Sequence, residues 1–199
     1  MIVDYCENID LPERVLEAHP NELLAIRYLD EGLRFLYRQV NRIEERVREQ
    51  VGADVQTVFV GRPPPFEWIP LGLVACSFHW YAISACNLTR LIGWLAHKED
   101  STEAAAYVDK VIPEVRLWRN KVAAHFALTD PRAEDTPADL VSSVMMPVGF
   151  DDDAFYTQPF SLTLGGAGEP STTRRDMRWS LTHVHRQLCR RYWPDDVED

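Results

Sequence analysis

The stretch "NELLAIRYLDEGLRFLYRQVNRIEERVREQV", from Asn21 to Val51, decides the fold class. Its apolar residues recur every three to four positions with charged residues between them, as one face of an amphipathic helix requires. Asn21 follows Pro20 and suits an N-cap, and Gly52 stands just past the other end. The stretch therefore predicts one long helix with a single buried face.

A second long helix is expected from about Pro70 to His97. No formal charge occurs between Glu67 and Arg90, and this length could span a bilayer. However, the segment contains several polar residues and few branched aliphatic residues, and no Lys/Arg cluster flanks one side. We therefore expect a central helix that is buried on all sides in a soluble bundle, with no membrane association.

A third helix is expected to begin near Thr102, with Asp100 or Ser101 as its N-cap. Pro113 either kinks this helix or occupies the first position of a new one. In both cases "PEVRLWRNKVAAHFAL" is helical and ends before Asp130, which precedes a proline.

The pattern changes in the last third of the chain. "SSVMMPV" and "FYTQPFSLTL" alternate like strands, and "GFDDDA" between them suits a turn. Pro147 and Pro159 restrict both strands to edge pairing. A last helix is expected from about Thr173 to Trp193. The sequence therefore predicts a mainly α single domain over residues 1–199, an antiparallel helical bundle with a small β-hairpin at about 142–164, inserted before the last helix.

Composition limits the functional classes. The chain of 199 residues has a formal net charge of −10, so any contact with nucleic acid would depend on a local basic patch. Its cysteines form no CxxC pair, and the acidic N-terminus does not resemble a signal peptide. We expect a cytoplasmic protein with reduced thiols at Cys6, Cys76, Cys86 and Cys189.

The stretch "WRNKVAAHF" places three reactive side chains, Arg119, Asn120 and His125, in a segment that otherwise suits a buried helix. On an ideal helix, Arg119 and His125 lie about 120° apart around the axis and roughly 9 Å apart along it. They do not share a face. Their simplest meeting point is a symmetric interface between two copies of the helix, which predicts a homodimer.

These residues resemble the HEPN superfamily (higher eukaryotes and prokaryotes nucleotide-binding), whose motif is Arg, four to six residues, then His, often with a polar residue after the Arg. Here Arg119 and His125 enclose five residues, and Asn120 occupies the polar position. The resemblance implies cleavage of RNA at a dimer interface without a metal or cofactor, leaving a 2′,3′-cyclic phosphate. It also implies a toxin or defence component, with an antitoxin as a possible partner.

The resemblance implies a role for each residue of the motif. His125 would be the acid/base, since an imidazole exchanges protons near neutral pH. Arg119 would stabilise the phosphate through its fixed donors. Asn120 would orient His125 or hold a phosphate oxygen. Ala127 stands where toxins that are silenced by a partner nucleotidyltransferase carry Tyr, so that mode of silencing is not expected.

The segment "TRRDMRWSLTHVHRQLCRRYW" is the locally basic region, and aromatic residues are interleaved with its arginines. Cations and stacking rings together suit an RNA-binding surface. The same pattern also suits the solvated face of an amphipathic helix, and both readings stay open. The residues expected to bind RNA are Lys121, Arg174, Arg175 and Arg178.

Two alternative functions remain. The first is a non-catalytic HEPN-like domain that contacts nucleotide, RNA or a partner protein. The second is a helical-bundle metalloenzyme, because His79, His97 and His125 are expected on three successive helices. No HExxH-type pair accompanies these histidines, so no metal is expected.

Overall fold

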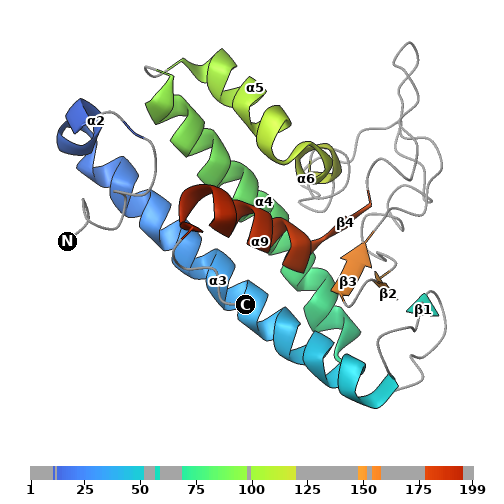
Figure 1. Cartoon of the computed structure of the whole chain (residues 1–199). Coiled ribbons are helices and arrows are strands. Elements are labelled where there is room, and N and C mark those ends of the chain that lie inside the picture. Colours follow the sequence, from blue (N-terminus) through green and yellow to red (C-terminus); the bar gives the residue numbers. More distant parts are fainter. Residues whose placement is uncertain are drawn as a thin grey trace, which may run out of the picture.

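The computed structural model describes residue 11 and residues 13–51, 57–58, 69–97, 100–119, 148–151, 154–157 and 178–194. Helices dominate this part of the chain, and a small antiparallel sheet lies at one end (Figure 1). The predicted mainly helical fold is therefore confirmed. The helices are α2 (Glu13–Ala18), α3 (Pro20–Val51), α4 (Leu71–Ala96), α5 (Ser101–Val111), α6 (Pro113–Trp118) and α9 (Leu181–Tyr192).

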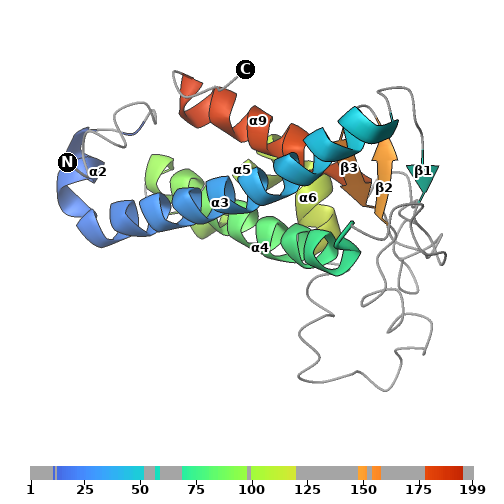
Figure 2. The same ribbon diagram turned by 90° about the horizontal axis from the view of Figure 1, so that it is seen from below.

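The helices form two layers. α3, α4 and α5 lie side by side with alternating directions, and α9 lies over them on one side (Figures 1 and 2). Side-chain contacts agree with this arrangement. Thr182 at the start of α9 bonds to α3, whereas Gln187 and Arg191 reach α5. α9 therefore closes the core over the first three helices.

α3 confirms the first predicted helix, but it begins at Pro20, so Asn21 lies within the helix and is not its N-cap. The apolar side of the helix that the sequence predicts packs against the core. Its central residues are exposed by 2% or less, so their burial supplies much of the hydrophobic stabilisation of this helix. They are Leu23, Ile26, Leu33, Val40 and Val47.

α4 confirms the second predicted helix, but the expectation that it is buried on all sides is wrong. Leu73 is 51% exposed and Trp80 64% exposed, seven residues apart on the same outward face. The outward face stays uncharged because the segment itself has no charge before Arg90. In the described part of the chain, α4 is the one helix long and apolar enough to cross a membrane, and half of that apolar window is buried.

α5 and α6 are separate helices. Asp100 caps α5, since its carboxylate accepts hydrogen bonds from the backbone N–H groups of Thr102 (2.7 Å) and Glu103 (3.1 Å). α5 ends at Val111, and Pro113 takes the first position of α6. Of the two readings of Pro113, the start of a new helix is therefore correct, as its missing N–H and fixed φ favour.

The sheet contains β1 (Thr57–Val58), β2 (Val148–Asp151), β3 (Ala154–Thr157) and β4 (Trp179–Ser180), in the order β1-β2-β3-β4. All neighbouring strands pair antiparallel. β2 and β3 fall within residues 142–164, so the predicted hairpin is confirmed. The expectation that both strands are restricted to edge pairing is wrong, because β1 and β4 flank them. The expected turn "GFDDDA" is wrong in part, because residues 149–151 belong to β2, and Phe150 is buried against the ring of Phe155.

The predicted start of the last helix is also wrong. Trp179 and Ser180 pair with β3, and α9 begins only at Leu181. The Ser180 hydroxyl accepts a hydrogen bond from the backbone N–H of His183 at 3.4 Å, which makes Ser180 the N-cap. The Trp179 ring packs in the core against Phe78, with ring centroids 4.9 Å apart, so the extended backbone here is held by burial as well as by pairing with β3.

Gly93 of α4 lies at a tight contact with Tyr107 of α5. A Cβ atom at this position would lie 2.8 Å from the ring of Tyr107 and 2.9 Å from its Cβ. Relief would therefore require the α5 backbone to shift. At Gly32, on the exposed side of α3, a Cβ would meet nothing within 4 Å.

We predict that Gly93→Ala lowers the free energy of unfolding by about 1–3 kcal/mol because it overpacks the contact between α4 and α5. Gly32→Ala is the matched control and should raise the free energy of unfolding by up to about 1 kcal/mol, since alanine favours helix. Urea unfolding followed by circular dichroism measures both. Equal effects of the two substitutions would contradict the assigned packing of α4 against α5.

Candidate functional site

Arg119 directly follows α6 and has helical backbone angles (φ −56°, ψ −44°). Its neighbour Trp118 is fully buried. The Trp118 ring contacts the rings of His79 (5.0 Å between centroids) and Trp179 (5.6 Å). This aromatic contact fixes the end of α6 against the core, and so it fixes the point from which the Arg119 side chain departs.

Arg119 lines a pocket of about 290 Å³ between α4, α5 and α6, close to the lower end of the range for small-molecule sites. Three of the lining residues are arginines, and α4 and α6 supply them. A guanidinium presents five donors in a fixed plane, which suits phosphate oxygens. The lining residues are Cys86, Asn87, Arg90, Ala105, Val108, Arg116 and Arg119.

The three arginines are not equivalent. Arg116 donates a hydrogen bond to the carbonyl of Ala105 at 3.0 Å and forms an ion pair with Asp109. Arg90 is exposed at the pocket rim. Asp109 therefore offsets part of the charge of Arg116, and the pocket keeps a net positive charge.

Cys86 is the nucleophilic side chain of this pocket, but it is held as a neutral thiol. Burial raises its pKa from 9.0 to about 11, although the nearby charges of Arg119 and Arg116 act in the opposite direction. A thiolate is required for attack by cysteine, and at neutral pH almost none forms at this residue. The pocket therefore suits binding of an anion rather than covalent catalysis by cysteine.

Arg178 is the other predicted site residue in the described part of the chain. It donates to Asp151 at 2.6 Å, and its guanidinium lies 3.9 Å from the ring centre of Tyr156. These contacts join the start of β4 to the hairpin, and Arg178 does not line the Arg119 pocket. The remaining predicted residues lie outside the described residues: Asn120, Lys121, His125, Arg174 and Arg175.

Sequence reasoning missed Arg90 and Arg116 as neighbours of Arg119. One signal for Arg116 was available, because it precedes Arg119 by three positions, and residues at this spacing share a helix face. Arg90 gave no comparable signal, since only the packing of α4 against α6 brings it to the pocket.

The proposed triad of histidines on three successive helices is wrong. His79 and His97 both belong to α4, His97 as its C-cap, and His125 lies outside the described residues. The ring of His97 contacts Tyr107, whereas burial beside Trp118 lowers the pKa of His79 to about 4. Among the described residues, no three His, Cys, Asp or Glu side chains gather as metal ligands.

A buried polar network ties α9 to the core. His185 hydrogen-bonds Tyr81 through Nδ1 at 3.0 Å, and its Nε2 lies 3.5 Å from Cys189 Sγ. Its ring stacks on Tyr37 with centroids 4.2 Å apart. Burial, and then the charges of nearby arginines, lower the pKa of His185 to about 3. The imidazole is therefore neutral at pH 7, and the network suits a structural role.

Glu44, in the C-terminal part of α3, joins three elements. Its side chain is fully buried, and it accepts hydrogen bonds from the backbone N–H of Phe155 (2.8 Å) and the hydroxyl of Thr182 (2.7 Å). Burial raises the pKa of this carboxyl from 4.5 to about 7, because desolvation outweighs both hydrogen bonds. β3 and the start of α9 are therefore fixed to α3 by a group that titrates near neutral pH.

We predict that Glu44→Gln becomes increasingly stable relative to the parent protein as the pH rises from 4.5 to 7. The native parent binds the Glu44 proton more tightly than the unfolded chain does, so the parent loses stability over this interval. The relative gain should reach roughly 3 kcal/mol, at about 1.4 kcal/mol per pKa unit. The histidines are common to both proteins, and their effect cancels in the comparison.

Urea unfolding at a series of pH values measures this difference. Glu45→Gln, at the adjacent exposed position, controls for the loss of a carboxyl group from α3. Parallel stability curves for the parent and Glu44→Gln would show that the buried carboxyl does not titrate as described.

No protein-family model matches this chain, and no curated protein or solved structure shows significant similarity to it. A functional assignment therefore rests on the residues of this chain and on their geometry.

Proposed function

We propose that the protein is an HEPN-like, metal-independent endoribonuclease in which Arg119 stabilises the phosphate and His125 exchanges protons. One observation supports the proposal above the others. Arg119 does not end in a solvated helix face but lines a pocket with Arg90 and Arg116. Three guanidiniums around one cavity, in a chain of net charge −10, suit a phosphodiester.

The proposed reaction is an attack of the ribose 2′-oxygen on the adjacent phosphorus. His125 takes the 2′-hydroxyl proton as the new P–O bond forms, and the bond to the 5′-oxygen breaks. A proton returns to that oxygen, so the products are a 2′,3′-cyclic phosphate and a 5′-hydroxyl. Arg119 stabilises the extra negative charge on the pentacoordinate phosphorus. Asn120 orients His125, and Lys121, Arg174 and Arg175 bind the flanking backbone.

The proposal includes a homodimer that forms through the outward face of α4. Leu73 and Trp80 are exposed on this face, and exposed apolar side chains rimmed by polar residues are typical of interfaces. Asn87 follows Trp80 by seven residues, so it lies two turns further along the same face. It also lines the Arg119 pocket. A symmetric contact through this face brings the pockets of two subunits close together.

We further propose a cytoplasmic toxin or defence component that an antitoxin neutralises. The second candidate is an HEPN-like domain that binds nucleotide or RNA without cleaving it. The ion pair between Arg116 and Asp109 favours this candidate, because it offsets part of the positive charge that would stabilise a transition state in the pocket.

We predict that purified protein cleaves a mixed RNA pool in the presence of EDTA and leaves 2′,3′-cyclic phosphate ends. His125→Ala should slow cleavage by roughly 10²–10⁴-fold, the usual contribution of a positioned acid/base. Arg119→Ala should slow it by roughly 10²–10³-fold, as the loss of one stabilising donor does elsewhere. Gel electrophoresis gives the rates, and mass spectrometry identifies the product ends.

Arg190→Ala is the control for loss of an arginine, since Arg190 is exposed on α9 and does not line the pocket. It should cleave at the parental rate. Equal rates for the parent and His125→Ala at equal purity would refute the assignment of His125. Activity that EDTA abolishes would favour the metalloenzyme, and a pure dimer without activity would favour the binding domain.

We predict that the parent protein is a dimer in solution and that Trp80→Glu converts it to a monomer, because the substitution places a charge in the proposed apolar interface. Tyr28→Glu is the matched control, since Tyr28 is also 64% exposed but belongs to α3. Light scattering after size exclusion gives the mass of each. A monomeric parent, or Trp80→Glu dimers of unchanged affinity, would rule out this interface.

A further inference from the structure

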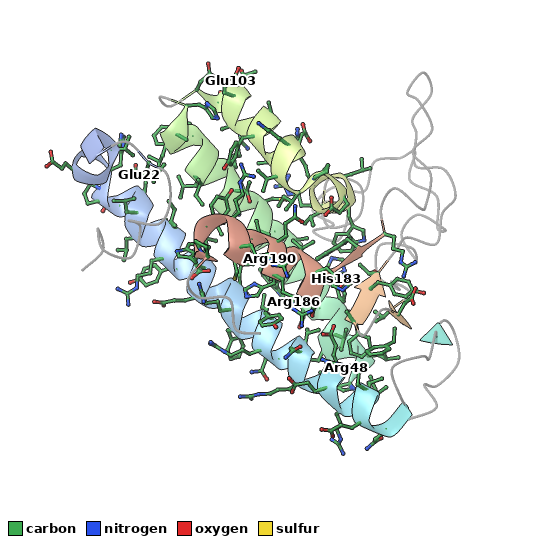
Figure 3. All side chains as sticks on the ribbon, viewed as in Figure 1. Glu22, Arg48, Glu103, His183, Arg186 and Arg190 are labelled. Carbon is green, nitrogen blue, oxygen red and sulfur yellow. The ribbon has the colours of Figure 1, made fainter. Side chains whose placement is uncertain are left out.

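A second pocket, of about 360 Å³, lies between α3 and α9 and is separate from the Arg119 pocket. Figure 3 shows Arg186 on α9 beside α3, and Arg48 further toward the C-terminal end of α3. We name this pocket the α3/α9 groove. Its lining residues are Tyr37, Arg38, Asn41, Arg42, Glu45, Arg48 and Arg186.

The spacing of the α3 residues explains the groove. Positions 38, 41, 42, 45 and 48 recur every three to four residues, so they form one stripe along the helix. α9 adds Arg186 from the opposite side. Contacts at both ends of α9 hold it beside the stripe: Thr182 bonds to Glu44, and the Arg34 guanidinium lies 5.5 Å from the ring centre of Trp193.

The groove carries an excess of positive charge. It has four arginines and one carboxylate, and that carboxylate, Glu45, accepts a hydrogen bond from Asn41 Nδ2 at 2.9 Å. Within the described ranges, no carboxylate oxygen lies within 4.0 Å of a guanidinium nitrogen of these four arginines, so none of them forms an ion pair there. The charge extends inward, since Arg38 and Arg186 contribute to the lowered pKa of His185.

Two buried polar atoms of the lining residues also lack partners in the described part of the chain. They are the Nε–H donor of Arg48 and the Oδ1 acceptor of Asn41. A buried donor or acceptor without a partner is costly, so both atoms call for a partner such as a bound water, ion or ligand. A phosphate oxygen satisfies the donor, and a sugar hydroxyl or base amino group beside the phosphate satisfies the acceptor.

We propose that the α3/α9 groove binds phosphate groups of a nucleotide or of a nucleic-acid backbone, with Arg38, Arg42 and Arg186 as donors at its mouth and Arg48 within it. Tyr37 also lines the groove, and its ring is held in position because it stacks on the buried His185. This binding requires neither the dimer nor the cleavage proposed above.

The test is binding of fluorescein-labelled single-stranded DNA, followed by fluorescence anisotropy over a range of salt concentrations. DNA lacks the 2′-hydroxyl, so cleavage does not interfere, and the two proposals fail separately. Four phosphate contacts predict a slope of about −3 in a plot of log affinity against log salt. Arg42→Gln and Arg186→Gln should each weaken binding about tenfold and reduce the slope by about 0.7.

The chain offers a matched control for each substitution. Arg46→Gln removes an exposed charge from α3, and Arg190→Gln removes one from α9, both outside the groove. Each should weaken binding less than twofold. Arg186→Lys keeps the charge without the planar donors and should fall between Arg186→Gln and the parent. Circular dichroism confirms that each variant is folded.

Competition identifies the source of the phosphate. Displacement of the DNA by pyrophosphate or ATP assigns the groove to free nucleotides, whereas displacement by unlabelled nucleic acid alone assigns it to a backbone. Three results would overturn the proposal: no saturable binding at low salt, equal losses in the groove and control variants, or displacement by polyglutamate as effective as by nucleic acid at equal charge.

Discussion

The buried carboxyl of Glu44 is the contact on which the rest of the structure depends. It bonds to Phe155 and Thr182, which follow it in the chain by 111 and 138 residues. Apolar packing alone is non-directional and permits α9 to rotate or slide over α3. Two hydrogen bonds to one fixed oxygen pair select a single position. The cost is the desolvation of an acid that would otherwise be ionised at neutral pH.

Both arginine sites follow from such buried contacts. Glu44 fixes the start of α9, and so it places Arg186 opposite the arginine stripe of α3. Trp118 fixes the end of α6 in the same way, and so it places Arg119 beside Arg90. In each case a rigid interior holds flexible cations close together. A bound anion would reduce the electrostatic repulsion between these arginines, and this favours the binding of phosphate at both sites.

The sequence predicts the long helices well, because a repeat of three to four residues over thirty positions has no other common explanation. The Asp100 cap and the hairpin follow from equally local signals. The start of α9 does not, since Trp179 could extend the helix. Its pairing with β3 and its packing against Phe78 are tertiary contacts, and they favour a strand. Glu44 and its neighbour Glu45 are the same residue type, so residue type alone does not distinguish them. The position of Glu44 in the helical repeat does, because it lies between Val40 and Val47 on the apolar face. Spacing along one helix indicates part of each arginine cluster, but Arg90 and Arg186 join the clusters only through tertiary contacts.

The most direct test is the titration of Glu44 itself. Carbon-13 labelling of glutamate side-chain carboxyls allows each to be followed by NMR against pH, and Glu44→Gln identifies the Glu44 signal by its disappearance. The structure predicts a midpoint near pH 7 for this carboxyl. A midpoint near the ordinary value of 4.5 would show that Glu44 is solvated, and that the contact between α3, β3 and α9 is not as described.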